Sequence, residues 1–195
     1  MSKRNDLVSI CLLYPDLLGT YGDGGNAVVL QKRLQWRGIG AEIIPVSMGE
    51  AVPENCDMYL MGGGEDQPQT SVTYQLESSR ALHRAVDKGA VVFAVCAGMQ
   101  VLGESFAIAG DKIREGLGLL DVTTVRGQGQ RRVGELVAQP VLANKEKLPA
   151  MTGYENHGGI TFLGSEAKAL AKVVTGKGND DGENSEGAIS ANGRV

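Results

Sequence analysis

The sequence offers little that would serve a disulfide framework, a membrane span or export. Its three cysteines, Cys11, Cys56 and Cys96, are an odd number without close spacing, which argues against disulfides and against a zinc-binding pattern. No apolar run approaches the roughly 20 residues that a membrane-spanning helix needs, and the first residues lack the cleavage site of a secretory signal. We therefore expect a cytoplasmic protein with reduced thiols.

The sequence also lacks a clustered basic surface. Acidic residues outnumber basic ones by 23 to 19, and the one basic cluster, Arg126 to Arg132, is too short to bind a nucleic acid backbone. The acidic, glycine-rich segment from Gly176 to Gly187 lacks the ligand register of a calcium loop. We interpret this segment as the solvated tip of a hairpin. We expect neither a nucleic acid partner nor a metal site.

Glycine, in contrast, is abundant, with 28 residues among 195. In the first half of the chain, short apolar runs alternate with segments whose apolar residues recur at helical spacing. Strands are predicted at 7–14, 41–46, 57–61 and 90–95, the last of these being the clearest buried strand, and helices at 27–38 and 72–89. This alternation predicts a doubly wound, mostly parallel α/β sheet with helices on both faces and with sites at the carboxyl ends of its strands.

The second half of the chain has a different pattern, with few helical signals. Strands are predicted at 118–125, 132–138 and 168–175, separated by glycine turns, which indicates an antiparallel extension of the α/β fold. We expect one domain over residues 1–195. A further strand is predicted at 186–190, and Asn192-Gly193 after it is typical of a hairpin turn, with Arg194-Val195 beginning a return strand. We therefore also expect that a carboxyl-terminal piece is missing.

Cys96 differs from the other two cysteines in its position. Cys11 and Cys56 belong to or precede apolar strands, where cysteine behaves as a small hydrophobic residue. Cys96 ends a predicted strand and begins a helix, where unbonded backbone N–H groups and the helix dipole favour a thiolate. Ala97 and Gly98 are small enough for the sharp turn that such a nucleophile needs. The same N–H groups could bind a developing oxyanion, and Gly63, at the end of a neighbouring strand, could bring a second donor.

Several segments together resemble a known enzyme family. Residues 94–100 (AVCAGMQ) are similar to the G-x-C-x-G-x-Q nucleophile segment of class I (triad) glutamine amidotransferases, with Ala94 where glycine is usual. Four further segments occur in the family's order. They look like its cobyric-acid-synthase-like branch and, more narrowly, like the amidotransferase subunits of bacterial lipid II isoglutaminyl synthases: 21–26 (YGDGGN), 62–66 (GGGED), 115–121 (EGLGLLD) and 153–159 (GYENHGG).

The resemblance implies a class I glutaminase-like fold and a chemistry centred on Cys96. Its thiolate would attack the side-chain amide of glutamine and form a glutamyl thioester, with Ala97 and Gln100 as supporting residues. The released ammonia would pass to a Mur-ligase-like synthetase subunit of the MurT type. That partner would use ATP and Mg to activate the α-carboxylate of D-glutamate in lipid II, so this chain would itself need no cofactor.

Arg131 is the expected anchor for the substrate glutamine. In the family an arginine three residues before a glycine binds glutamine, and Arg131 stands three residues before Gly134. A guanidinium suits this task because it can bind an α-carboxylate through two hydrogen bonds. Arg132 is adjacent, so spacing alone separates the two, and without the resemblance both could be exposed strand arginines.

The general base is not identified by the sequence. His157, with Glu155 as its orienting acid, is the candidate that the residues alone would suggest, whereas His83 is expected to pack against the sheet. In the family the catalytic histidine lies in a later G-T-Y-x-H-G-P segment, which this sequence does not contain. We therefore expect that Cys96 can be alkylated but that the chain hydrolyses glutamine poorly.

Three other functions remain as alternatives. One is an amidotransferase of the corrin (cobyric acid) type, and another is a non-catalytic interaction module on the same fold. Residues 22–27 (GDGGNA) also match the G-x-G-x-x-A pattern of dinucleotide sites. They do not follow a strand directly, as that site requires, so the match is a weak indication.

Overall fold

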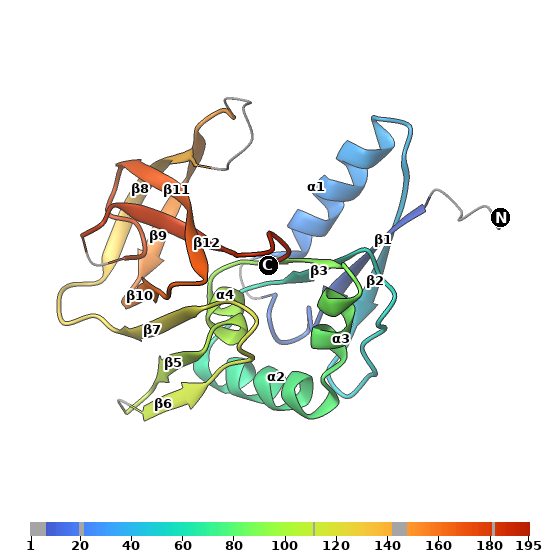
Figure 1. Ribbon diagram of the computed structural model, residues 1–195, viewed down its shortest axis with the longest axis horizontal. Coiled ribbons are helices and arrows are strands. Elements are labelled where there is room, and N and C mark those ends of the chain that lie inside the picture. The colour runs from blue at the N-terminus through green and yellow to red at the C-terminus, as the bar shows by residue number, and fades with distance from the viewer. Residues whose placement is uncertain (1–6, 20–21, 111, 142–147, 181) are drawn as a thin grey trace. The chain divides into compact units, whose positions relative to one another are not determined.

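The computed structural model describes residues 7–19, 22–110, 112–141, 148–180 and 182–195, which belong to two compact units (Figure 1). Unit 1 comprises Met1–Leu102 together with Arg194–Val195, and unit 2 comprises Gly103–Gly193. Each unit has its own sheet structure, described separately below. A single amidotransferase domain over 1–195 stays a prediction.

Unit 1 contains a parallel sheet of four strands in the order β2-β1-β3-β4. The strands are β1 (Leu7–Leu13), β2 (Gly40–Val46), β3 (Met58–Met61) and β4 (Val91–Ala94). Register pairs Leu13 with Val46 on one side and with Met61 on the other, so the three carboxyl ends lie level. Chain order reverses direction at β1, since β2 lies on one side of it and β3 on the other. Such a reversal is where doubly wound sheets place their sites.

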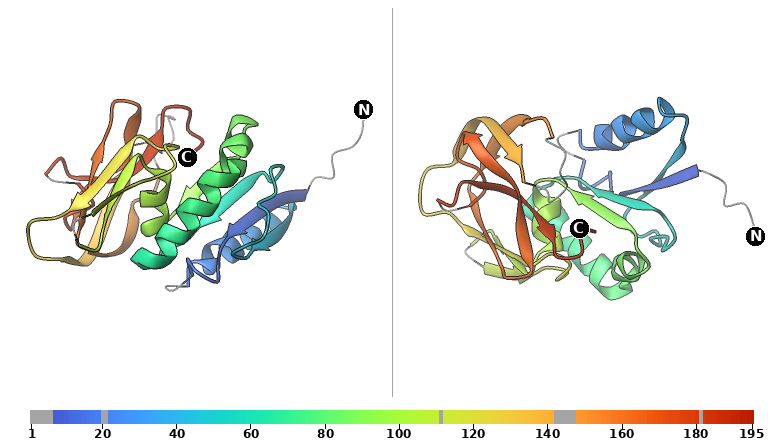
Figure 2. Two further views of the ribbon diagram at one scale, coloured as in Figure 1. Left: turned by 90° about the horizontal axis from the view of Figure 1, so that it is seen from below. Right: turned by 45° about the horizontal axis from the view of Figure 1, so that its top comes forward.

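Helices cover both faces of this sheet, as predicted (Figure 2). They are α1 (Gly24–Gln35), α2 (Asp66–Ser79), α3 (Ala81–Asp87) and α4 (Ala97–Leu102). On one face, Ala27 of α1 packs in a buried cluster with Ile10, Ala41 and Leu60. On the other lie α2 and α3. No helix in the described ranges is both long enough and apolar enough to cross a bilayer.

Two predictions about unit 1 were wrong in detail. The helix predicted at 72–89 is two helices, because Arg80 adopts the left-handed conformation (φ 53°) and separates α2 from α3. The segment with the clearest sequence pattern of a buried strand, β4, lies at the edge of the sheet, and Val91 and Phe93 are 36% and 41% exposed. Its apolar sequence therefore reflects one covered face rather than two.

Unit 2 is made of two four-stranded sheets, in the orders β10-β7-β5-β6 and β12-β11-β8-β9. Its strands are β5 (Ser105–Ile108), β6 (Lys112–Glu115), β7 (Val122–Arg126), β8 (Arg132–Pro140), β9 (Met151–His157), β10 (Gly159–Leu163), β11 (Ala167–Thr175) and β12 (Ser185–Ser190). All pairings are antiparallel except that between β5 and β7. The antiparallel extension is confirmed, although the strands at β5, β6, β9 and β10 were not predicted.

The segment 176–187 connects β11 to β12 in a hairpin, as its composition suggests, but it is solvated only in part. Asp180 and Ser185 are buried, and the Asp180 carboxylate accepts hydrogen bonds from the Ser185 N–H (2.7 Å), the Ser185 hydroxyl and the Gly182 N–H (3.1 Å). Burial opposes ionisation of Asp180, but these hydrogen bonds outweigh it and lower the pKa of the carboxyl. The acidic side chain therefore organises the loop from inside.

The carboxyl-terminal residues form the predicted turn but not the predicted hairpin. The N–H of Gly193 donates to the carbonyl of Ser190 (2.9 Å), which closes a β-turn. The carbonyl of Arg194 then accepts the Val92 N–H (2.7 Å), and its guanidinium donates to the carbonyl of Gly89. Arg194 therefore bonds to the free edge of β4 instead of returning along β12.

Candidate active site

Cys96 stands at a sharp turn between β4 and α4, as predicted from its small neighbours. Its φ is +56°, which non-glycine residues rarely adopt and which is found where a strained turn exposes a nucleophile. The Val95 N–H donates to the Met61 carbonyl (3.0 Å), so the β3–β4 ladder extends to the residue before the cysteine. Cys96 is exposed, and the N–H of Ala97 is the first of α4, where no intrahelical acceptor exists.

The other two cysteines have the opposite environment. Cys11 and Cys56 are both buried in unit 1. Burial raises the pKa of each thiol, and the neighbouring Cys56 raises that of Cys11 further. Since the thiolate is the reactive form, these two cysteines are chemically quiet. Among the three cysteines, Cys96 alone combines exposure with a helix N-terminus.

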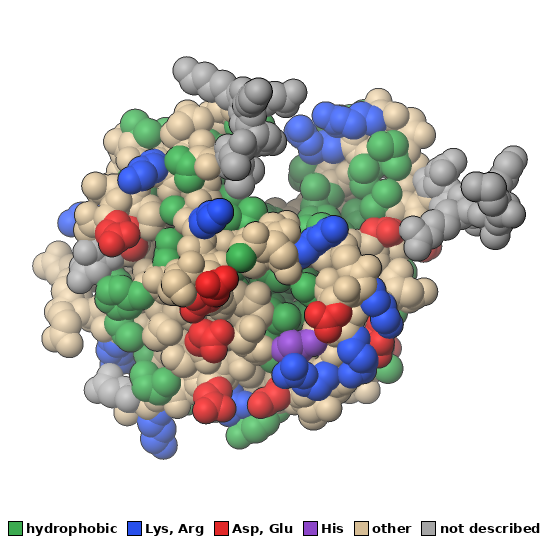
Figure 3. Space-filling view, viewed as in Figure 1, with side chains coloured by type: hydrophobic (Ala, Val, Ile, Leu, Met, Phe, Trp, Pro, Cys, Tyr) green, Lys and Arg blue, Asp and Glu red, His purple; other side chains and the backbone are tan. Residues whose placement is uncertain are grey.

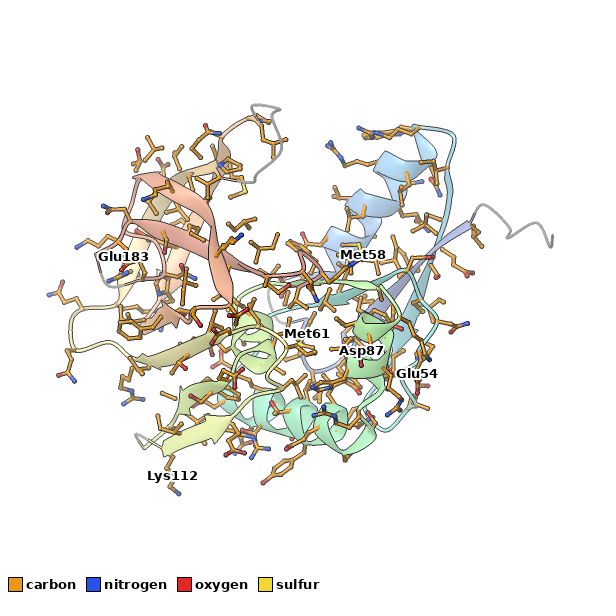
Figure 4. All side chains as sticks on the ribbon, viewed as in Figure 1. Glu54, Met58, Met61, Asp87, Lys112 and Glu183 are labelled. Atoms are coloured by element: carbon orange, nitrogen blue, oxygen red, sulfur yellow. The ribbon has the colours of Figure 1, made fainter. Side chains whose placement is uncertain are left out.

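Two glycines allow main chain to approach Cys96 closely. A Cβ added to Gly63 would lie 2.9 Å from the Cys96 Cβ and 3.0 Å from its Sγ. A Cβ added to Gly98 would lie 2.9 Å from the carbonyl oxygens of both Met61 and Gly62. Figure 4 labels Met61, at the end of β3 next to α4. Larger residues at 63 or 98 would therefore push the cysteine turn away from the 62–64 loop.

The N–H of Gly63, expected to be an oxyanion donor, has a partner in this structure. It donates to a carboxylate oxygen of Asp23 at 2.7 Å. Asp23 immediately precedes α1 but makes no side-chain cap to that helix. The sequence reasoning missed this residue, although it belongs to the YGDGGN segment, of which Tyr21 lies outside the described residues. A carboxylate in this place competes with a developing oxyanion for the Gly63 N–H.

Gln100 supports the site by linking α4 to α2. Its side-chain oxygen accepts a hydrogen bond from the Gln69 side-chain nitrogen (2.8 Å), which also lies 3.4 Å from the Ala97 carbonyl oxygen. Gln69 is only 2% exposed, so its amide is used inside the protein. Cys96, Gly63, Ala97 and Gln100 are thus brought together by unit 1, and Gln69 is a supporting residue that the sequence did not indicate.

Arg131 lies in unit 2, directly before β8, and lines a cavity of about 520 Å³ together with residues of the 125–133 and 155–162 segments and Lys177. Its guanidinium Nε donates to the Asn156 side-chain oxygen (2.6 Å), and its Nη2 donates to the Asn156 carbonyl (2.9 Å). Arg131 remains exposed to solvent. Its cationic group is thus oriented and accessible.

Arg132, the alternative anchor, is used differently. Its Nη1 donates to the main-chain carbonyls of Gly178 (2.7 Å) and Asp180, so it fastens the 176–187 segment to β8. This geometry favours Arg131 over Arg132 as the arginine that binds a ligand.

His157 and Glu155 do not form the pair that the residues alone suggested. The His157 Nδ1 lies 2.9 Å from the Gly159 carbonyl, which can only accept, so Nδ1 carries the proton and Nε2 is the basic nitrogen. The Glu155 carboxylate, which is buried, instead accepts N–H groups of Lys177 and Gly178 (2.9 Å to the latter). Glu155 therefore stabilises the turn at 176–178. Both residues belong to unit 2, as Arg131 does.

Surface charges elsewhere in unit 1 form ordinary exposed pairs. Figure 3 shows acidic and basic side chains side by side on this surface. Glu54 pairs with Arg84 (2.7 Å) and with Lys88 (2.9 Å). Hydrogen bonds from Arg84 and Lys88 lower the pKa of Glu54 to about 2. Such solvent-exposed pairs are no indication of a site.

Comparisons with known proteins identify the family of this chain. Residues 9–195 match the CobB/CobQ-like glutamine amidotransferase domain. The chain is 32% identical over 182 residues to the "Lipid II isoglutaminyl synthase (glutamine-hydrolyzing) subunit GatD" of Streptococcus pneumoniae, covering 92% of this chain and 68% of that protein. It is 30% identical over 174 residues to the protein of that name from Staphylococcus aureus, covering 88% and 68%.

More distant relatives belong to the same branch. A "Probable cobyric acid synthase" of Methanosphaera stadtmanae is 32% identical over 148 residues, which cover 71% of this chain and 29% of that protein. A solved structure described as "glutamine amidotransferase" has the same fold, with a TM-score of 0.55 at 18% identity over 84% of this chain and 79% of the other. The chain belongs to the family of CobB/CobQ-like glutamine amidotransferase domains.

Proposed function

We propose that this chain is a glutaminase subunit that releases ammonia from L-glutamine through a thioester on Cys96. The observation that carries the proposal is the exposed, left-handed Cys96 between β4 and α4. The thiolate attacks the amide carbon of the glutamine side chain, and a C–S bond forms. The C–N bond then breaks, the nitrogen takes a proton and leaves as ammonia, and water hydrolyses the thioester to glutamate.

The remaining residues have separate roles in this proposal. Arg131 binds the α-carboxylate of the glutamine, a role that its accessible and oriented guanidinium suits. The Ala97 N–H and, once the Asp23 carboxylate has moved away, the Gly63 N–H stabilise the oxyanion. Gln100 fixes the start of α4 through Gln69.

We further propose that the ammonia serves the amidation of the D-glutamate α-carboxylate in lipid II. The names of the relatives from Streptococcus pneumoniae and Staphylococcus aureus support this substrate, since both are subunits of lipid II isoglutaminyl synthases. The acceptor carboxylate would be activated with ATP and Mg on a Mur-ligase-like partner of the MurT type, in the cytoplasm. This chain then needs no cofactor of its own.

Covalent labelling with a diazoketone analogue of glutamine tests the proposed nucleophile. We expect one adduct, located at Cys96 by peptide mass spectrometry, slowed by excess L-glutamine and abolished by Cys96→Ser. Cys11 and Cys56 serve as internal controls, because both are buried. Labelling that spares Cys96, although the protein is folded, would contradict the glutaminase proposal and support an interaction module.

A corrin-amidating function is the second candidate, because cobyric acid synthases are also among the relatives. Co-expression with a Mur-ligase-like synthetase discriminates the two. If the proposal is right, the pair amidates lipid II with glutamine as nitrogen donor, and Cys96→Ser leaves only ammonia-dependent amidation. Amidation of a corrin carboxylate instead of lipid II would favour the second candidate. Full glutaminase turnover by the 195-residue chain with its partner would identify His157 as the base.

A further inference from the structure

The guanidinium of Arg131 is bound from two directions by one residue, Asn156. The Nε–H donates to the side-chain oxygen at 2.6 Å and an Nη2–H donates to the main-chain carbonyl at 2.9 Å. An arginine side chain has several rotatable bonds and loses entropy when it is fixed. Two contacts to the same residue fix the plane of the guanidinium, which one contact would not do.

These contacts leave a defined part of the guanidinium available. An arginine has five N–H donors, and the two bonds to Asn156 use one on Nε and one on Nη2. Both donors of Nη1 and the second donor of Nη2 remain, and together they form the end of the group that can bind a carboxylate with two parallel hydrogen bonds. Asn156 therefore determines which edge of Arg131 is presented to a ligand.

The position of Asn156 is itself fixed by the sheet. In the antiparallel β8–β9 pair, Asn156 lies opposite Val133, and the register continues without a shift from Arg132–His157 to Ala138–Met151. Arg131 comes directly before this ladder. A guanidinium that would otherwise move at the end of a strand is thereby attached to the neighbouring strand.

The chemistry of the acceptor also matters. Asn156 offers a neutral amide oxygen, so it orients Arg131 without neutralising its charge. A carboxylate at the same position would form an ion pair with Arg131 and compete with the carboxylate of a substrate. A neutral acceptor is what a carboxylate-binding arginine requires from a residue that only positions it.

We propose that Asn156 is a positioning residue for glutamine binding. It holds Arg131 so that the end of the guanidinium formed by Nη1 and Nη2 is directed to the substrate α-carboxylate. This inference rests on the proposed function, in which Arg131 binds glutamine. It assigns a role in substrate recognition to an exposed asparagine that itself need not touch the substrate.

The test compares two alkylating reagents on the same thiol in the purified chain. The diazoketone analogue of glutamine carries an α-carboxylate, whereas iodoacetamide does not, so the ratio of their rates at Cys96 isolates recognition from thiol reactivity. We expect Asn156→Ala to lower this ratio about 10-fold, as loss of a hydrogen bond to a charged group does, and Arg131→Ala to lower it further. Gln128→Ala, which removes an amide from the lining of the same cavity, is the control and should leave the ratio unchanged.

Asn156→Asp tests the need for a neutral acceptor. It keeps a side-chain oxygen for the Nε–H, so the ¹⁵N–¹H signal of the Arg131 Nε should stay shifted as in the wild type, yet the rate ratio should fall. In Asn156→Ala the same signal should move toward that of a solvated arginine. The affinity for glutamine, titrated by NMR on each variant, should follow the rate ratio.

The outcomes separate the inference from the function on which it rests. If Arg131→Ala lowers glutamine affinity while Asn156→Ala and Asn156→Asp do not, the positioning role is wrong and the proposed anchor stands. If Arg131→Ala leaves the affinity unchanged, the anchor is wrong and the positioning role falls with it. If Asn156→Ala lowers both the rate ratio and the thermal midpoint of unfolding while Asn156→Asp binds glutamine with normal affinity, Asn156 is a structural residue and the positioning role is wrong.

Discussion

The two compact units of this protein position their candidate site residues by different kinds of contact. In unit 1, a parallel sheet ends in main chain that approaches a cysteine closely, and glycines at 62–64 and 98 make the approach possible. In unit 2, polar side chains meet groups that lie just outside the paired strands. Arg131, directly before β8, bonds to Asn156 of β9, and Glu155 of β9 accepts the N–H groups of Lys177 and Gly178. The geometry at Cys96 in unit 1 depends on space for close main-chain packing, whereas the geometry at Arg131 and Glu155 in unit 2 depends on hydrogen bonds between polar groups.

This difference predicts how each unit responds to substitution. A methyl group added at the cysteine turn collides with main-chain atoms that cannot move aside cheaply. A charge removed in unit 2 changes hydrogen bonding and ionisation but leaves the backbone in place. Steric changes should therefore have large effects on reactivity in unit 1, and charge changes should mainly alter the pH dependence of stability in unit 2.

Gly98→Ala should have the largest effect. The new Cβ would lie 2.9 Å from the carbonyl oxygens of Met61 and Gly62, so α4 must shift and move Cys96. We expect the alkylation rate of Cys96 to fall by about 10-fold or more and the free energy of unfolding to fall by about 1–3 kcal/mol. Gly25→Ala is the matched control, because no atom lies within 4 Å of its added Cβ. That helical substitution should stabilise the protein by about 0.5–1 kcal/mol. If Gly98→Ala changes neither the alkylation rate of Cys96 nor the free energy of unfolding, the steric account is wrong.

Glu186→Gln should change the pH dependence of stability in unit 2. Burial, followed by the nearby Glu155, raises the pKa of Glu186 from 4.5 to about 7. Between these values the folded state binds more protons than the unfolded state, so stability should fall as pH rises from about 4.5 to about 7 and stay level above. The variant should lose this decline and gain about 1–2 kcal/mol at pH 8, as urea unfolding at pH 5 and pH 8 would show.

The control for this comparison is Glu183→Gln. Glu183, which Figure 4 labels, is an exposed residue of the 176–187 segment, three residues before Glu186. It should leave the slope of stability against pH unchanged. If both variants behave alike, surface charge in general, and not the burial of Glu186, sets the slope. The proposed difference between steric effects in unit 1 and buried-charge effects in unit 2 would then have no support from unit 2.

Asp23→Ala should have the smallest effect, and its sign is informative. Removing the carboxylate releases the Gly63 N–H and takes a negative charge from the neighbourhood of the thiol. We expect iodoacetamide to modify Cys96 about threefold faster at pH 7. Asp16→Ala, which removes a carboxylate bonded to the Met48 N–H instead, should not change the rate. A slower reaction in Asp23→Ala would mean that Asp23 positions the 62–64 loop for catalysis.

Much of unit 1 could be predicted because its signals are local. Apolar runs located β1, β2 and β3, the glycines directly after β3 located the loop at Gly63, and small residues after Cys96 identified the turn. Local signals failed where a neighbour in space decides the outcome. The sequence cannot show that β4 has one covered face, or that Arg80 interrupts a helix.

The site in unit 2 was less accessible to sequence reasoning for the same reason. His157 and Glu155 are two residues apart and looked like a catalytic pair, but register and loop path give each a different partner. Arg131 and Arg132 differ in the sequence only by their spacing to Gly134, whereas in the structure they have different partners. Arg131 bonds to Asn156, and Arg132 bonds to the main-chain carbonyls of Gly178 and Asp180. These hydrogen-bond partners have no sequence signal.

The sequence by itself determined the sharp turn at Cys96, the parallel arrangement of the first strands and the family resemblance, because each depends on segments of residues that are close along the chain. Only the tertiary structure decided that Asp23 occupies the Gly63 N–H, that Gln69 supports Gln100 and that Asn156 orients Arg131. These partners are between 25 and 40 residues apart. Hydrogen bonds are directional and short-ranged, so such pairs exist only once strands and helices have brought the groups within about 3 Å.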